Sequence, residues 1–188
     1  MALALPRPTS RNAQQILSFW FEDTKPYQWY RRDLAFDQLI RERFSALHKA
    51  AVARRLDAWR AHPHHALALI ILLDQFSRNM FRGDPRSFAQ DGLAVDVARD
   101  AITRRYDRLY GSRERAFFYM PFMHAEDLDI QRKSIALFKA RCMDNIPHAC
   151  EHHDIIKRFG RFPHRNKTLG RVSTPEEIAF LKAGGFNP

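Results

Sequence analysis

Cysteines and long apolar runs are both scarce in this sequence of 188 residues. Its two cysteines are too few for the disulfide framework of a small secreted protein. The longest apolar run, residues 66–73, is far shorter than the roughly 18 residues that span a bilayer. The opening segment MALALPRP lacks the apolar run of a signal peptide. We therefore expect a soluble, reduced, cytoplasmic protein that does not enter a membrane.

Lysine is also scarce, and this affects how the formal net charge of +10 is interpreted. The chain has 24 arginines and only 7 lysines, which are spread along its whole length without a basic tail. Pairs such as Arg31–Arg32 and Arg104–Arg105 fall in or beside helical patterns, where a solvated helix face is the ordinary outcome. No helix-turn-helix, zinc-finger or RNP-like pattern accompanies them. Nucleic acid is therefore not the expected partner.

Aromatic residues, in contrast, are plentiful. The 15 Phe, 5 Tyr and 3 Trp residues supply far more buriable surface than a disordered chain carries. A chain of this length buries roughly 70% of its unfolded surface on folding. The 7 glycines mostly mark the ends of helical patterns, and no Gly-Ser or Pro-rich linker divides the chain. These features predict one domain with a substantial hydrophobic core.

Apolar residues recur at three- and four-residue spacing almost throughout, which is typical of amphipathic helices. No segment is a convincing strand. The predicted helices cover residues 13–20, 36–51 (with Asp33 as N-cap), 63–83, 91–102, 126–143, 147–159 (stopped by Gly160) and a last helix capped by Thr174. We predict a single all-α domain of antiparallel helices over residues 1–188, with an ordered core of about 12–184.

A first polar stretch, LDQFSRNMFRG at residues 73–83, follows the most apolar part of the chain. Asp74 and Arg78 have the i,i+4 spacing of a structural ion pair, and that is one interpretation. The other is that Arg78 and Arg82, with Asn79 beside them, form a forked set of donors for a carboxylate or phosphate.

A second polar stretch, YMPFMHAEDLDIQ at residues 119–131, places His124 directly before Glu126 and Asp127. A carboxylate beside an imidazole fixes its tautomer and raises its pKa, which is the basis of general acid–base catalysis. These carboxylates could also bind a divalent ion. A structural alternative is that His124 caps a helix and the acids complement its dipole.

A third stretch, HHDIIKRFGRFPHRN at residues 152–166, gathers basic residues around a helix end and a proline-containing loop. Arg158, Arg161, Arg165 and His164 could form an anion site that the neighbouring phenylalanines anchor to the core. Alternatively, the arginines cap the carbonyl groups at the end of the preceding helix.

A shorter pattern has the H-x-x-E-H form of inverted zinc peptidases, with its histidines at His148 and His152. The pattern arises easily by chance among nine histidines, and too little chain follows it for a distant acidic ligand. We therefore predict no metal site and no cofactor.

The three polar stretches belong to longer motifs, LALIILLDQFSRNMFRG, FFYMPFMHAEDLDIQ and DIIKRFGRFPHRN, which ILSFWF precedes and LGRVSTPEEIAFL follows. In this order they resemble the bacterial family called domain of unknown function 924, over nearly the whole chain. The resemblance implies a tetratricopeptide-like, right-handed superhelix of antiparallel helices, and it implies no activity. Ser77 departs from the family pattern, which commonly has proline there, so we expect this helix to keep an amide hydrogen bond and to be straighter.

Three functional hypotheses follow from the polar stretches. The first is a helical scaffold whose stretches converge on one pocket for a small anionic ligand. Its binding residues would be Asp74, Arg78, Asn79, Arg82, His124, Glu126, Asp127, Arg161, His164 and Arg165. The second is a hydrolase or transferase acting on a phosphate or carboxylate substrate, with His124, Glu126 and His164 as candidate acid–base residues. The third is a module that binds a peptide or a protein.

Overall fold

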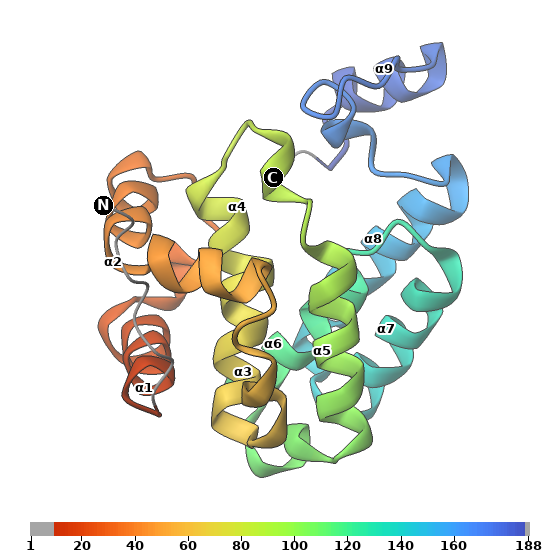
Figure 1. Cartoon of the computed structure of the whole chain (residues 1–188). Helices are drawn as coiled ribbons and strands as arrows, with labels where there is room; N and C mark the ends of the chain where they lie inside the picture. The colour runs from red at the N-terminus through yellow and green to blue at the C-terminus, as the bar shows by residue number, and fades with distance from the viewer. Residues whose placement is uncertain (1–9, 187–188) are drawn as a thin grey trace.

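The computed structural model describes residues 10–186, and the regular structure in this range is entirely helical. Figure 1 labels α1 (Ser10–Ser18), α2 (Leu34–Val52), α3 (Pro63–Ile71), α4 (Ser77–Met80), α5 (Asp91–Thr103), α6 (Ser112–Met123), α7 (Leu128–Arg141), α8 (Ile146–Phe159) and α9 (Pro175–Lys182). Two π-helical segments, Phe19–Asp23 and Leu72–Phe76, extend α1 and join α3 to α4. The all-α prediction is confirmed, whereas the segment MALALPRP, residues 1–8, lies outside the described residues.

Helix ends form where the capping residues predict them. The Asp33 carboxylate accepts hydrogen bonds from the amides of Ala35 and Phe36 at 3.0 and 3.1 Å, which fixes the start of α2. At the end of α8, Gly160 adopts a left-handed φ of +70°, which costs a residue without a Cβ little. Thr174 begins α9 with a capping box. The Thr174 hydroxyl accepts a hydrogen bond from the amide of Glu177, and the Glu177 carboxylate accepts one from the amide of Thr174. These local rules therefore set three helix boundaries.

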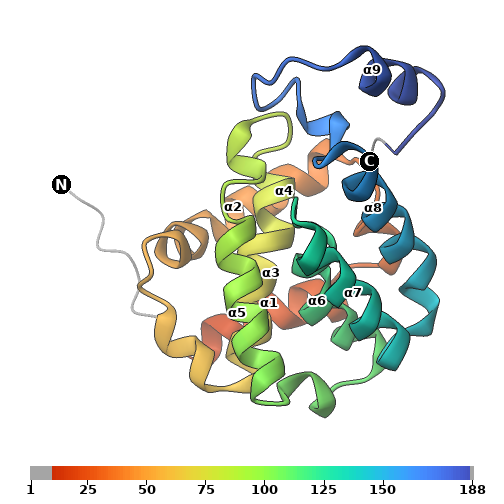
Figure 2. The ribbon, with the colours of Figure 1, turned by 90° about the vertical axis from the view of Figure 1, so that its right-hand side faces the viewer.

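The amphipathic pattern does not predict α6. From Ala116 to Met123 every residue of this helix is buried, so no polar face reveals a helical period. Pro121 lies inside the helix and favours a loop interpretation of the same residues. The helix is nevertheless held between α5 and α7, which pack on it from both sides (Figure 2).

The predicted helix over residues 63–83 is helical as far as Met80 but is not regular throughout. The π-helical segment Leu72–Phe76 lies directly before Ser77. The Ser77 hydroxyl donates to the Leu73 carbonyl at 2.7 Å and lies 2.8 Å from Nε2 of His48. The helical pitch therefore changes directly before Ser77, and the straighter helix expected from serine in place of proline stays a prediction.

The core is centred on residues 66–73 of α3 and its π-helical extension, which are apolar and buried on all sides as the sequence predicts. Helices α1, α5 and α6 pack around α3, and α2 packs against α4. Phe76 is fully buried, and its ring contacts those of Phe19, Trp20 and Phe44 at centroid distances of 6.1, 5.5 and 4.9 Å. This aromatic cluster joins the first two helices to the centre of the domain.

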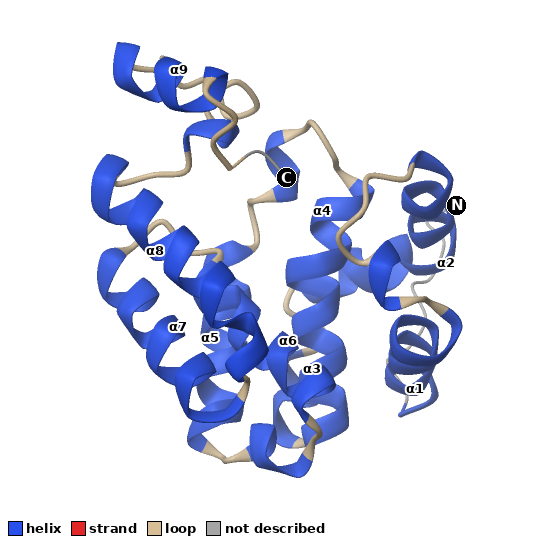
Figure 3. Ribbon diagram, turned by 180° about the vertical axis from the view of Figure 1, so that it is seen from behind, coloured by secondary structure: helices blue, strands red, loops and turns tan. Residues whose placement is uncertain are grey.

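Helices α5 to α8 follow one another in space as they do in sequence, each packed on the next (Figure 2). Figure 3 shows α9 beyond the end of α8, outside this bundle. The right-handed superhelix remains a prediction. No helix within residues 10–186 is long and apolar enough to cross a membrane.

We predict that Phe76→Ala lowers the free energy of unfolding by about 3–5 kcal/mol, because it leaves a cavity among three aromatic rings. Urea unfolding followed by circular dichroism measures this change. Leu109→Ala is the control, since Leu109 is 70% exposed and its truncation is expected to change stability by less than about 0.5 kcal/mol. A loss below about 1 kcal/mol at Phe76 would contradict the central position assigned to it.

Candidate functional site

The candidate site is built around Asp74, in the π-helical segment before α4. Asp74 is only 1% exposed, so its carboxylate needs partners inside the protein. Oδ1 forms an ion pair with Arg78 NH1 at 2.9 Å and lies 2.8 Å from Nδ1 of His124, and Oδ2 accepts from Nε2 of Gln75 at 2.5 Å. Burial raises the pKa of Asp74, but Arg78, His124 and Gln75 together bring that pKa below its usual value. The carboxylate is therefore ionised at neutral pH.

The predicted pair of Asp74 and Arg78 is thus present, and it extends into a larger network. Arg78 NH2 donates to both oxygens of Asp91, at 3.0 and 3.1 Å. Arg165 NH1 donates to Asp91 Oδ2 at 2.9 Å, and Arg165 NH2 donates to the carbonyl of His124 at 2.9 Å. The first residue of α5 therefore connects α4 to the turn after α8.

Arg165 is held in this network by aromatic stacking as well as by hydrogen bonds. Its guanidinium carbon lies 4.4 Å from the ring centroid of Phe88 and 4.5 Å from that of Phe162. Burial lowers the pKa of Arg165 to about 10, so the group stays charged at neutral pH. Its Nε is buried without a hydrogen-bond partner among the described residues.

His124 differs from the sequence prediction in its partner and in its pKa. The carboxylate that holds Nδ1 belongs to Asp74, which lies on another helix, and neither Glu126 nor Asp127 contacts the ring. Burial lowers the pKa of His124 and outweighs the opposite effect of Asp74, so the expected increase was wrong. Since Asp74 is ionised, Nδ1 carries the proton of the neutral ring. Nε2 then presents a lone pair, and no hydrogen bond within residues 10–186 involves it.

Two further histidines lie near His124. The ring centroids of His124 and His152 are 6.1 Å apart, and the His164 ring packs against Phe162 at 5.6 Å. Burial lowers the pKa of both His152 and His164 to about 3, so all three imidazoles are neutral at physiological pH. Phe186, near the end of the described chain, covers His152 and His164 at centroid distances of 4.5 and 5.3 Å.

Other predicted site residues lie beside this network or away from it. Glu126 accepts two hydrogen bonds from Arg171, at 2.7 and 2.9 Å, and one from the amide of Phe162 at 2.8 Å. It thus fixes the loop that carries His164 and Arg165. Asp127 is the N-cap of α7, where its Oδ1 accepts from the amide of Ile130. Asp127 therefore begins α7, while His124 is the C-cap residue of α6, as the capping alternative predicts.

Three predicted residues bind carboxylates elsewhere in the chain. Asn79 and Arg82 both donate to Asp37 of α2, at distances between 2.6 and 3.0 Å. Arg161 donates to both oxygens of Glu177 in α9, at 2.7 and 2.9 Å. These arginines are neutralised by acids of the protein and are not joined to the Asp74 network by any hydrogen bond.

The sequence patterns did not predict three carboxylate or arginine partners in these ion pairs, namely Asp91, Arg171 and Asp37. In the sequence Asp91 is predicted only to begin a helix, and its two arginine partners are 13 and 74 positions away. A buried arginine requires a carboxylate, but the sequence does not say which of several acids supplies it. Only the packing of α5 against the central helix selects Asp91.

The H-x-x-E-H pattern does not form a set of converging ligands. Within residues 10–186, no three His, Cys, Asp or Glu side chains lie close enough to hold a metal ion. Nδ1 of His152 lies 2.8 Å from the carbonyl oxygen of His148, while the His148 side chain faces solvent.

We predict that His152 makes the protein less stable as the pH falls below 6.5. In the unfolded chain the imidazole takes up a proton near its usual pKa of 6.5, whereas in the folded protein it does so only near pH 3. Lowering the pH between these values therefore favours unfolding, by up to about 1.4 kcal/mol per pH unit. His152→Asn should flatten the dependence of unfolding free energy on pH between 6.5 and 4.5, measured by urea unfolding.

His148→Asn is the matched control, because it removes an exposed imidazole from the same helix. It should leave the wild-type slope unchanged. Equal slopes in wild type and His152→Asn would show that the His152 ring is not held neutral by burial.

The chain is similar to known proteins in both sequence and structure. A comparison with curated proteins finds no match. The solved structure of a protein of unknown function from Agrobacterium tumefaciens is similar, with a TM-score of 0.90 and 44% sequence identity over 94% of this chain and 100% of that chain. The sequence model of a family of bacterial proteins of unknown function, DUF924, matches residues 16–185. The chain therefore belongs to the bacterial protein family DUF924.

Proposed function

We propose that this protein is a hydrolase or transferase in which His124 is the general base. The observation that carries this proposal is the hydrogen bond of 2.8 Å between Asp74 and Nδ1 of His124, which leaves Nε2 as the ring nitrogen that makes no hydrogen bond to the described residues. A buried carboxylate that orients an imidazole and leaves its far nitrogen available is the arrangement that proton abstraction requires.

The protein's own residues account for each part of the proton transfer. Nε2 of the neutral His124 takes a proton from a water molecule or from a hydroxyl group of the substrate, which then attacks the electrophilic carbon or phosphorus. The imidazolium that forms is stabilised by ionised Asp74, and it gives its proton to the leaving group as the bond between that group and the carbon or phosphorus breaks. Arg78 and Gln75 hold Asp74 in place through the bonds described above. Asp74 is therefore a positioning residue and His124 a catalytic residue.

Two buried nitrogens support a phosphate or carboxylate group on the substrate: Nε of Arg165 is a donor, and Nδ1 of His164 is a donor in the tautomer that carries its proton there. Nε of Arg165 and Nδ1 of His164 are both buried without a partner among residues 10–186. Unsatisfied buried donors are costly, and an anionic group would satisfy them. Arg165 also binds the carbonyl of His124, which joins these donors to the proposed base.

The same donors favour a second candidate function, which is a scaffold that binds a small anion without converting it. In its favour, Arg165 is charged, is nine-tenths buried and keeps an unpartnered nitrogen. Against a pocket that binds anions strongly, Arg78 and Arg165 share the carboxylate of Asp91, which reduces their positive charge. Turnover of a substrate distinguishes the two functions, because a scaffold binds and releases its ligand unchanged.

We predict that His124→Gln lowers turnover at least about 100-fold, since general base catalysis contributes roughly 10²–10⁴. The measurement is a screen of phosphate esters, carboxylic esters and amides, with the best substrate then tested on the variants. His153→Asn is the control, because His153 is on α8 and its Nδ1 contacts Asp154 rather than the network. Equal turnover of His124→Gln and wild type would remove His124 from the mechanism.

The pH dependence of the rate gives a further prediction. The base acts in its neutral form, and burial holds the pKa of His124 below 6.5. The rate should therefore stay level from pH 8 down past pH 6.5 and fall only in more acidic solution. Asp74→Asn should lower the rate and release Nδ1, which nitrogen NMR of the imidazole detects as a change of tautomer. A rate that already falls by half at pH 7 would contradict this assignment.

A further inference from the structure

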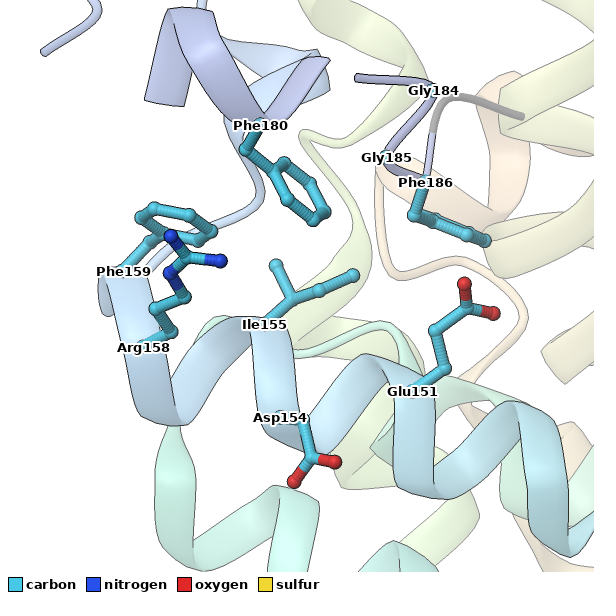
Figure 4. A pocket seen from close by; sticks show the side chains of 9 residues that line it. All are labelled: Glu151, Asp154, Ile155, Arg158, Phe159, Phe180, Gly184, Gly185 and Phe186. Atoms are coloured by element: carbon cyan, nitrogen blue, oxygen red, sulfur yellow. The ribbon is translucent and has the colours of Figure 1, made fainter. Parts of the chain in front are cut away.

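A cavity of about 290 Å³ lies outside the proposed acid–base site, between α8, α9 and residues 184–186 (Figure 4). Its apolar lining comes from Ile155 and Phe159 of α8, Phe180 of α9 and Phe186. The rings of Phe159 and Phe180 are 5.1 Å apart between centroids. Three aromatic rings from three separate segments therefore surround one small space.

The aromatic walls already hold one cation of the protein. The guanidinium carbon of Arg158 lies 4.7 Å from the ring centroid of Phe159 and 5.9 Å from that of Phe180. Arg158 also pairs with Glu176 at 2.8 Å, so its charge is neutralised. The faces of these rings are thus placed where a positive charge is attracted to them.

The charged residues that line this cavity are Glu151, Asp154 and Arg158, and Arg158 is already paired with Glu176. Glu151 has no ion pair or hydrogen bond among the described residues, and its side chain extends toward Phe186 at the edge of the cavity (Figure 4). Asp154 also lines the cavity, but its carboxylate points away from the aromatic rings (Figure 4). Glu151 is therefore an unpaired negative charge beside an aromatic wall.

The shape of the cavity depends on a glycine. A Cβ atom on Gly185 would lie 2.6 Å from the Phe180 ring, far inside van der Waals contact. Glycine at this position lets residues 184–186 approach α9 and bring Phe186 over the cavity. A larger residue would have to displace the Phe180 ring.

We propose that this cavity binds a small organic cation, in which an ammonium group pairs with Glu151 and an apolar body packs on Phe180, Phe186 and Ile155. Charge complementarity selects this ligand class: an anion would meet Glu151, and a neutral apolar ligand would leave it unpaired. The inference is independent of the proposed function, since none of the cavity residues belongs to the Asp74–His124 pair.

The test uses benzyltrimethylammonium as the probe and benzyl alcohol as its neutral counterpart, each titrated into the full chain and followed by NMR and calorimetry. We expect the cation to shift the resonances of α8, α9 and residues 184–186, and the alcohol to bind more weakly. Glu151→Gln and Phe180→Leu should each weaken binding of the cation by about threefold to fivefold, as for partly exposed ion pairs and cation–π contacts. Gly185→Ala should weaken it by distorting the cavity without a change of charge.

Asp154→Asn is the matched control, because it removes a neighbouring carboxylate that points away from the rings. It should weaken binding less than Glu151→Gln does. Raising the ionic strength should weaken binding to wild type and have little effect on Glu151→Gln. Equal affinity for the cation and the alcohol, unchanged binding to Glu151→Gln, or resonance shifts spread over the rest of the surface would each overturn the proposal.

Discussion

The burial of the Asp74 carboxylate is the constraint on which the rest of the candidate site depends. A charge that is 1% exposed requires compensation, and Arg78, Gln75 and His124 provide it. Arg78 in turn needs a second carboxylate, which Asp91 supplies, and Asp91 also binds Arg165. Four segments that are distant in sequence meet because each charged side chain of the network forms an ion pair or a hydrogen bond with a group from another segment. The network therefore links the central helix, α5, the loop before α7 and the turn after α8.

Pairing of partly buried arginines with carboxylates explains why a strongly basic chain has a nearly neutral interior. Arg82, Arg161 and Arg171 are each matched by a carboxylate, from Asp37, Glu177 and Glu126. The excess positive charge lies elsewhere, on exposed side chains such as those of Arg31 and Arg32. Neutral surroundings suit an imidazole that must remain unprotonated, since burial without a net negative charge lowers its pKa. The low net charge of the buried interior therefore suits the proposed role of His124 as a base better than a site dedicated to binding an anion.

The C-terminal segment links the two sites described above. Phe186 covers His152 and His164 and also lines the cavity beside Glu151. It can take this position because Gly184 has a left-handed φ of +80° and Gly185 packs against Phe180. Phe186 thus contacts both the buried histidines with a lowered pKa and the cavity that Glu151 lines.

The sequence by itself determined the all-helical class, most helix boundaries and the i,i+4 pair of Asp74 and Arg78, because caps, periodicity and helical spacing are local properties. It also marked the three polar stretches that carry His124 and Arg165. It missed α6, whose buried faces show no period, and it gave His124 the wrong carboxylate and the wrong direction of pKa shift. Those features depend on which groups are buried against which, and only tertiary packing decides that. The same holds for Asp91, whose partners lie 13 and 74 positions away.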